Sequence, residues 1–321
     1  MDNFVLETHN LKKYFPAGPG MTLHALDGVN LRIRKGRTLG VVGESGCGKS
    51  TLGRTILRLS EPTDGQIFLN GQEITGLNGR ELRKLRPKMQ LIFQDPYASL
   101  NPRMTVEDSI AEPMLVNRMF RTKAEAYGRV DELMEIVGLA SRNASLFPHE
   151  ISGGLRQRVG IARALATDPE FIVCDEPVSA LDVSIQAQIL NLLMDLQEQM
   201  HMSYLFISHD LSVVKHISHD VSVMYLGQCV ESGPTEEIFR HPLHPYTRAL
   251  LDAIPTPSLS TREKEPQIIR GEVVSPINPQ PGCRFAARCP YATERCREEQ
   301  HEREIRSGHS VMCCRAEELR E

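Results

Sequence analysis

The sequence predicts an α/β protein that ends in a short cysteine-rich extension. Strand-like and helix-like segments alternate from about residue 37 to 253. Short apolar runs bounded by turn residues suit parallel strands covered on both faces, and they lie at 38–43, 171–174 and 204–208. Two longer segments have apolar residues at helical spacing, at 122–138 and 184–201. Alternation of this kind is typical of an α/β fold.

Length and composition exclude several classes of protein. The 321 residues suit one large domain with an appendage, or two domains, and 40% apolar residues suffice for a core. A net charge of −4 lacks the basic surplus typical of nucleic-acid binding. No apolar run approaches the roughly 18 residues that cross a bilayer, and no secretory signal opens the chain. Attachment to a membrane through a partner stays open.

The two ends of the chain differ from the alternating core. The first 35 residues contain short β-like pieces separated by glycine and proline, which predicts an antiparallel β flap against the main sheet. Prolines at positions 255, 257, 266, 276, 279 and 281 predict a linker or an extended connection. We therefore expect one domain over residues 1–254 and an extension over residues 255–321.

Residues 43–51 match the pattern of a phosphate-binding P-loop between a strand and a helix. The segment reads Gly43, Glu44, Ser45, Gly46, Cys47, Gly48, Lys49, Ser50 and Thr51. Its glycines let the backbone curl so that N–H groups face phosphate oxygens, and the following helix adds its positive end. We expect Lys49 to reach the β- and γ-phosphates and the hydroxyl of Ser50 to hold Mg²⁺. The alternative is a chance glycine-rich turn.

Two further elements indicate nucleotide hydrolysis. The apolar run at 171–174 is followed by Asp175, which is placed to reach Mg²⁺ through its water shell, and by Glu176, which is placed to orient or deprotonate the attacking water. Upstream, Ser152, Gly153 and Gly154 precede a helical run and predict a second helix N-terminus that can bind an anion. Taken alone, that start is only a helix cap.

In this order, the three elements resemble the ATP-binding subunits of ABC transporters over residues 4–253. The resemblance implies a P-loop NTPase fold with a RecA-like core, an antiparallel β subdomain and a helical subdomain. It implies an ATPase coupled to transport, with ATP and Mg²⁺ as cofactors. Residues 152–157 resemble the signature motif, from which Ile151 and Leu155 depart. Leu155 removes a polar group that could contact the partner's nucleotide.

The resemblance also implies roles for single residues. Gln94 matches the Q-loop, which binds Mg²⁺ and water and senses the transport subunit, and Asp182 closes a D-loop-like segment at 179–182. His209 resembles the switch histidine, and Tyr14 lies near the place of the aromatic residue that stacks on adenine. Each of these residues also has a purely structural interpretation. Gln94 could be a surface amide, His209 a residue at a helix start and Tyr14 a core aromatic.

The implied catalytic and cofactor-binding residues form three sets. The catalytic residues are Glu176, His209, Lys49 and Gln94. The ligands of Mg²⁺ are Ser50, Gln94 and Asp175. The nucleotide contacts come from residues 43–51 with Tyr14, Asp175, Ser152, Gly153, Gly154 and Asp182.

In this family two ATPase subunits pack head to tail, so that Ser152 of one faces the P-loop of the other. ATP then closes the pair and hydrolysis opens it. The resemblance implies the same cycle for this chain.

Three stretches resemble the dipeptide/oligopeptide (and nickel) importers, namely 92–103, 178–184 and 244–250. The chain most resembles the second ATPase of such an importer. The resemblance implies that it pairs with a paralogous ATPase, two membrane permeases and an extracytoplasmic binding protein, at the cytoplasmic face of the inner membrane. An importer for nickel, glutathione or another small solute is the alternative. A non-transport ABC ATPase, a P-loop kinase or GTPase, and a degenerate regulatory partner fit the sequence less well, and the transported solute cannot be read from an ATPase.

Four cysteines of the extension lie within 31 residues: Cys283, Cys289, Cys296 and Cys313. Four soft ligands suit Zn²⁺ or an iron–sulfur cluster, but the close cysteine pairs that zinc sites favour are missing among the first three. The wide spacing, together with the resemblance, favours a [4Fe–4S] cluster over zinc or unliganded thiols. Cys314 is the alternative fourth ligand. Outside this group, Cys174 is expected to be a buried structural thiol.

Overall fold

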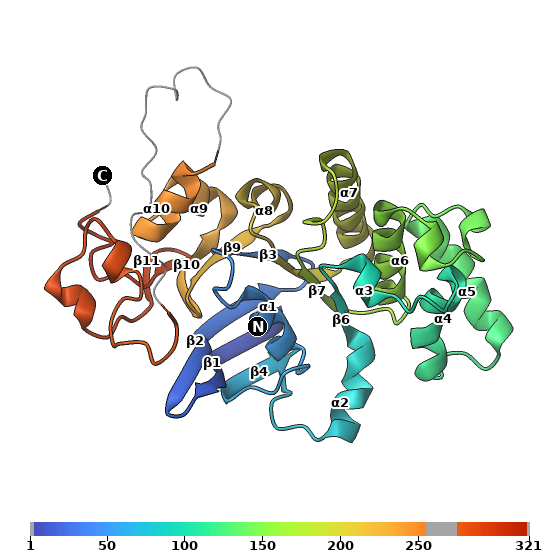
Figure 1. Ribbon diagram of the computed structural model, residues 1–321, viewed down its shortest axis with the longest axis horizontal. Helices are drawn as coiled ribbons and strands as arrows, with labels where there is room; N and C mark the ends of the chain where they lie inside the picture. Colours follow the sequence, from blue (N-terminus) through green and yellow to red (C-terminus); the bar gives the residue numbers. More distant parts are fainter. Residues whose placement is uncertain (1–2, 255–274, 320–321) are drawn as a thin grey trace, which may run out of the picture. The chain divides into compact units, whose positions relative to one another are not determined.

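Two structural units make up the chain, which the computed structural model describes over residues 3–254 and 275–319. Unit 1 comprises Met1–Leu6, Ile33–Arg37 and Asn70–Phe206. Unit 2 comprises Glu7–Arg32, Thr38–Leu69 and Ile207–Glu321. Figure 1 follows the chain from the blue N-terminal strand to the red extension.

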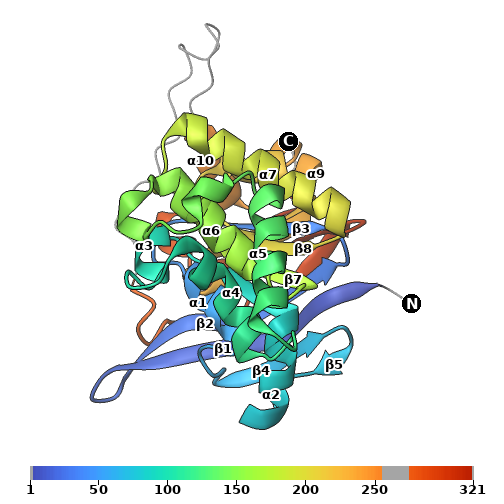
Figure 2. The same ribbon diagram turned by 90° about the vertical axis from the view of Figure 1, so that its right-hand side faces the viewer.

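Unit 1 combines buried strands with a group of helices. Strands β6 (Met89–Ile92) and β7 (Phe171–Asp175) pair in parallel, and β8 (Ser203–Ile207) lies beside β7. Three helices pack against one another, as Figure 2 shows: α4 (Val106–Val116), α5 (Lys123–Ile136) and α6 (Gly153–Leu165). The other elements are β5 (Gln72–Glu73), α2 (Gly79–Leu85), η1 (Arg86–Lys88), α3 (Pro96–Ser99), η2 (Ser141–Asn143), η3 (Pro148–Glu150) and α7 (Val183–Met200).

Unit 2 contains strands in the order β11-β12-β10-β9-β3 and the N-terminal flap. The strands are β3 (Thr38–Val42), β9 (Asp220–Tyr225), β10 (Gln228–Pro234), β11 (Arg303–Arg306) and β12 (His309–Val311). The flap consists of β1 (Phe4–Gly18), β2 (Met21–Arg34) and β4 (Asp64–Leu69). The helices are α1 (Lys49–Ile56), α8 (Leu211–Ile217), α9 (Thr235–Arg240), α10 (Pro245–Asp252), η5 (Ala286–Arg288) and η6 (Glu294–Arg297).

The predicted α/β fold and its main elements are confirmed. All five residues of β3, β7 and β8 are buried, as continuous apolar runs predict for strands covered on both faces. The predicted helices over 122–138 and 184–201 are α5 and α7. Their starts are fixed by N-caps, because Thr122 accepts the N–H of Glu125 at 3.2 Å and Asp182 accepts that of Ile185 at 3.0 Å. Among the described residues, no helix has the length and apolarity needed to cross a bilayer.

The C-terminal extension adds strands to the sheet of unit 2. Strand β12 pairs antiparallel with β10, and β11 pairs with β12. A buried carboxylate reinforces this junction, since Glu231 of β10 accepts the N–H groups of Leu243 and His244 and lies 2.8 Å from Nε2 of His309. Residues 255–274 of the predicted linker lie outside the described residues. Farther along, His24 donates to the carbonyl of Pro276 at 3.0 Å, so the extension also joins the flap.

A cluster of buried rings attaches the extension to the rest of unit 2. Phe285 is buried, and its ring centroid lies 5.3 Å from that of Tyr225 and 5.4 Å from that of Tyr246. Tyr225 and Tyr246 contact each other at 4.6 Å. His244 completes the cluster, 5.9 Å from Phe285. Its Nδ1 accepts the N–H of Tyr246 at 3.1 Å and caps α10.

We expect a His244→Asn variant to lose less stability than the wild type between pH 7 and pH 5. Burial lowers the pKa of His244 to about 4, against 6.5 for the exposed group. Below pH 6.5 the unfolded chain therefore gains a proton that the folded chain does not bind. Stability falls by about 2 kcal/mol from this site over that interval. Asparagine can still cap the helix but does not titrate. Urea unfolding of both proteins at each pH measures the difference, and equal pH slopes would contradict the assignment.

Candidate nucleotide-binding site

The phosphate loop, residues 43–51, joins β3 to α1 in unit 2. Gly48 has a φ of 107°, and a β-carbon there would overlap the carbonyl oxygen of Ala25. A β-carbon on Gly43, whose φ is 151°, would overlap the carbonyl oxygen of Met224. The loop is therefore packed against neighbouring backbone so closely that only glycine fits these two positions.

Lys49 places its ammonium group inside the curl of the phosphate loop. The side chain is 5% exposed, and Nζ donates to the carbonyls of Gly43 at 2.8 Å and Glu44 at 3.0 Å. Cys47 lies next to it and is also buried, which raises the pKa of its thiol. A buried cation in a loop of this shape is placed to meet phosphate oxygens.

Residues outside the loop hold it in place. The N–H of Gly227 donates to the carbonyl of Cys47 at 2.8 Å, and the N–H of Glu44 donates to the hydroxyl of Tyr246 at 2.8 Å. The carboxylate of Glu44 accepts from both terminal nitrogens of Arg288, at 2.8 and 3.0 Å. These contacts of Tyr246 and Arg288 were not predicted. The stretch 244–250 and the two arginines between Cys283 and Cys289 were the available signals, but neither reveals a partner 200 residues away.

Tyr14 belongs to a polar cluster near the start of β2. Its hydroxyl donates to Asp27 at 2.5 Å, and its ring stacks on His24 with centroids 4.0 Å apart. Burial and this hydrogen bond raise the pKa of Tyr14. Arg284 pairs with the same carboxylate. Although burial opposes it, the hydrogen bond from Tyr14 and the charge of Arg284 lower the pKa of Asp27.

Backbone hydrogen bonds connect the Tyr14 cluster to the phosphate loop. Asp27 donates its N–H to the carbonyl of Gly227 at 2.8 Å, and the N–H of Gly227 reaches Cys47. The candidate adenine contact and the candidate phosphate site therefore share one support within unit 2.

In unit 1 the acidic pair lies where β7 ends. Asp175 is 4% exposed, and Glu176 follows it with a φ of 47°, a left-handed conformation that is uncommon for glutamate. The side-chain nitrogen of Gln94 donates to Glu176 at 3.1 Å. The structure thus brings together the predicted Q-loop amide and the predicted base. The positive φ of Glu176 was not predicted from the sequence.

The predicted signature residues form the start of α6. Ser152 is exposed and caps the helix by accepting the N–H of Leu155 at 3.4 Å. Gly154 lies against Ile185 of α7, whose N-cap is Asp182. In unit 2, His209 is exposed and stands directly before Asp210, the N-cap of α8. The expected roles of these residues with nucleotide stay predictions.

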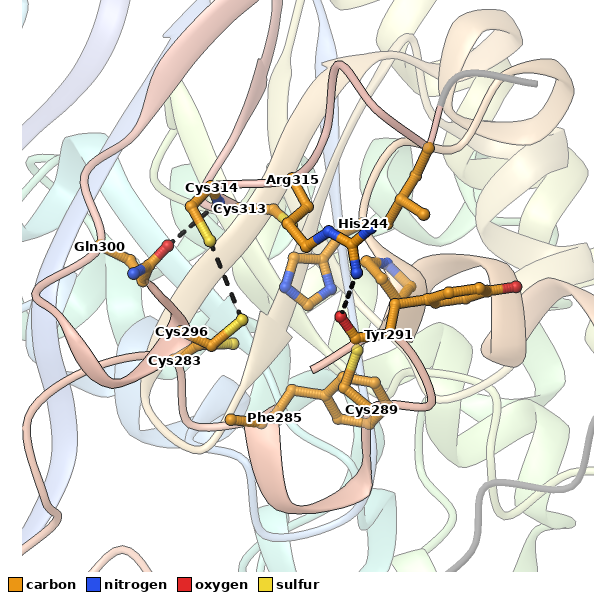
Figure 3. Close-up of a pocket in the computed structure, with 13 residues that line it drawn as sticks. His244, Cys283, Phe285, Cys289, Tyr291, Cys296, Gln300, Cys313, Cys314 and Arg315 are labelled. Carbon is orange, nitrogen blue, oxygen red and sulfur yellow. Dashed lines mark hydrogen bonds between the residues drawn. The ribbon is translucent and has the colours of Figure 1, made fainter. Parts of the chain in front are cut away.

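The cysteines of the extension line one pocket, which Figure 3 shows. All four predicted ligands and Cys314 contribute to its wall, together with residues that include His244, Phe285 and Arg315. The sulfur atoms of Cys296 and Cys314 are 3.8 Å apart. Burial raises the pKa of Cys283 to about 12 and raises the pKa of Cys289 and Cys313, so a metal would have to displace protons from these thiols.

These thiols share a pocket without forming a preassembled metal site. Among the described residues, no three histidine, cysteine, aspartate or glutamate side chains are arranged to hold a metal ion. As predicted, Cys174 is fully buried, and burial raises its pKa.

Replacing Gly48 by alanine should weaken ATP binding by at least about tenfold, because the new methyl group displaces the loop and φ is positive there. The matched control is Gly128→Ala in α5, where a β-carbon meets open space. That control should gain about 1 kcal/mol of stability and bind ATP normally. Equilibrium titration with ATP measures both proteins, and equal affinities would show that the loop tolerates the shift.

Comparison with known families agrees with this geometry. Residues 26–179 match the family model described as ABC transporter. Residues 230–296 match the model described as oligopeptide/dipeptide transporter, C-terminal region. The second match includes Tyr246 of α10 and Arg288, both of which contact Glu44.

Similar proteins match along nearly the whole chain. The oligopeptide transport ATP-binding protein AppF of Bacillus subtilis is 51% identical over 318 residues, which is 96% of each chain. The oligopeptide transport ATP-binding protein OppF of Escherichia coli is 49% identical and covers 98% of this chain and 97% of its own. The di/tripeptide transport ATP-binding protein DppF of Pseudomonas aeruginosa is 47% identical and covers 98% of both.

Solved structures match the cassette. One is an ATP-binding cassette dimer in a post-hydrolysis state with ADP and Pi, which has a TM-score of 0.66 and 30% identity and covers 72% of this chain and 98% of its own. The cassette of a cbiONQ transporter from Clostridium perfringens matches with a TM-score of 0.66 and 27% identity, over 74% of this chain and 91% of its own. The chain therefore belongs to the ATP-hydrolysing subunits of ABC transporters, in the branch that carries the oligopeptide/dipeptide transporter C-terminal region.

Proposed function

We propose that this chain powers the import of dipeptides or oligopeptides across the cytoplasmic membrane. The observation that carries the proposal is the match to peptide-transport ATP-binding proteins at 47–51% identity across both the cassette and the extension. Matches limited to the cassette would support transport without any solute class. The match across the extension favours peptide importers.

The proposed catalytic roles are those that the resemblance to ABC ATPases implies, and the contact between Gln94 and Glu176 supports one of them. Lys49 and the loop amides hold the β- and γ-phosphates, while Ser50 and Asp175 hold Mg²⁺. Glu176 takes a proton from the attacking water, and Gln94, which donates to it at 3.1 Å, orients the carboxylate. His209 acts at the γ-phosphate and Tyr14 stacks on adenine.

The proposed assembly contains a second, paralogous ATPase. Ser152 and the amides of Gly153 and Gly154 contact the γ-phosphate bound to that partner, with Asp182 at the same interface. Two membrane permeases hold the pair at the cytoplasmic face, and an extracytoplasmic binding protein delivers the peptide. Leu155 lacks the polar group of the usual signature glutamine, so the site that it helps to complete loses a polar contact.

The Glu176→Gln variant should keep ATP binding, lose at least about 100-fold in hydrolysis and accumulate the closed ATPase pair. Glutamine keeps the contact geometry with Gln94 but cannot accept the proton. Glu170→Gln is the matched control, because Glu170 directly precedes the same strand and pairs with Lys88. Phosphate release and size-exclusion chromatography with ATP measure the two effects. Fast ATP turnover by Glu176→Gln would show that Glu176 is not the catalytic base.

The solute class is tested in proteoliposomes that contain the full transporter. Uptake of labelled dipeptides and oligopeptides should require ATP and stop in the Glu176→Gln variant. If nickel or glutathione stimulated ATP hydrolysis and peptides did not, the transported solute would be nickel or glutathione and the proposed peptide solute would be wrong.

We also propose that the cysteine pocket binds a [4Fe–4S] cluster. Support comes from the four soft thiol ligands on one pocket wall. To bind the cluster, the thiols must rotate toward a common point and lose their protons. The bound cluster would then link the segments of the extension that carry these cysteines. Cys313 is the preferred fourth ligand.

Protein purified without oxygen should be brown, absorb broadly near roughly 400 nm and contain about four iron atoms per chain. Cys296→Ser should abolish the colour, whereas Cys229→Ser, outside the pocket, should not. Serine at Cys313 and at Cys314, tested separately, identifies the fourth ligand. A colourless preparation without iron would refute the cluster, and one zinc per chain would assign zinc instead.

A further inference from the structure

The short loop from Cys283 to Cys289 carries two arginines whose charged groups are buried in unit 2. The side chain of Arg284 is 5% exposed and that of Arg288 is 7% exposed. Arg284 pairs with Asp27 in the Tyr14 cluster, and Arg288 pairs with Glu44 in the phosphate loop. One loop of the extension therefore reaches both parts of the candidate nucleotide site in unit 2.

Arg288 binds Glu44 in a rigid, two-point geometry. Its terminal nitrogens donate to the two carboxylate oxygens at 2.8 and 3.0 Å, and one of them also donates to the hydroxyl of Tyr225 at 3.2 Å. The guanidinium carbon lies 5.8 Å from the centroid of the Tyr225 ring. Paired forks of this kind are stronger than single hydrogen bonds and define an orientation.

The position of Glu44 makes this pairing matter for ATP. Glu44 is the second residue of a loop whose amides and lysine serve an anion, and its own carboxylate would repel phosphate. Its carbonyl accepts from Lys49 at 3.0 Å, and its N–H donates to Tyr246. Arg288 both neutralises the acid and fixes the residue whose backbone contacts the lysine.

We propose that Arg288 is a positioning residue for nucleotide binding, acting through Glu44 from the C-terminal extension. Tyr246 supports the same residue from the backbone side. The proposal rests on ATP binding at the phosphate loop. It adds that the extension supplies the charge that lets an acidic residue occupy this loop.

Removing the charge of either partner should change ATP affinity, in opposite directions for Arg288 and Glu44. Arg288→Met leaves a bare carboxylate at the loop, and ATP affinity should fall by about tenfold. Glu44→Gln leaves the arginine charge uncompensated beside the phosphates, and ATP affinity should rise by about threefold. A role in folding alone would weaken binding in both variants or in neither.

The experiment is equilibrium titration of the full-length chain with Mg-ATP for both single variants, the double variant and Arg288→Lys. The double variant should bind ATP within about threefold of the wild type, because no charge is left unpaired. Arg288→Lys should recover part of the loss, since lysine keeps the charge without the fork. Arg295→Met is the control, because Arg295 pairs with Glu318 in the same extension and should bind ATP normally.

Thermal unfolding of each variant separates binding from folding. Wild-type affinity in Arg288→Met would overturn the proposal, as would a double variant no better than that single variant. If Arg288→Met does not fold, the direction of the change in ATP affinity in Glu44→Gln decides the question. Weaker ATP binding in Glu44→Gln would overturn the proposal. Failure of the wild type to bind ATP would instead refute the proposed function.

Discussion

A loop that binds phosphate through its backbone has few side chains with which to hold itself in place. Its glycines are needed for the curl, and its lysine donates to carbonyls of the loop itself. Support must come from neighbouring segments, and the structure supplies it through Gly227, Tyr246 and Arg288. Each of these residues contacts backbone or charge that the loop cannot satisfy alone.

The same need explains how the extension is attached. It adds β12 to the edge of β10, it packs Phe285 against the rings of Tyr225 and Tyr246, and it places His309 against the buried carboxylate of Glu231. A flexible appendage could not hold Arg288 at hydrogen-bonding distance from Glu44. The apolar and polar contacts of the extension therefore help to keep the guanidinium of Arg288 at a defined place beside Glu44.

The elements that depend on local sequence pattern could be predicted from the sequence. Strands β3, β7 and β8 are short apolar runs, and α5 and α7 follow helical spacing behind good N-caps, so each could be located. The phosphate loop was equally clear, because its chemistry demands certain residues at certain spacings. The pairing of Asp27 with Arg284 and the contacts of Glu44 with Tyr246 and Arg288 could not be predicted, since they depend on the approach of segments more than 200 residues apart. The left-handed backbone conformation of Glu176 could not be predicted either, because glutamate rarely adopts a positive φ and no local pattern signals it.

The buried pairing between the phosphate loop and the extension also constrains how such subunits can exchange parts. An acidic second residue in the loop and a guanidinium in the distant tail form one charge pair, even though either could be altered alone. Chimeras that join a cassette to a foreign tail must therefore match both ends of the pair. Crossovers that keep the sheet register and the acidic loop residue but lose the arginine would produce well-folded hybrids with poor nucleotide retention.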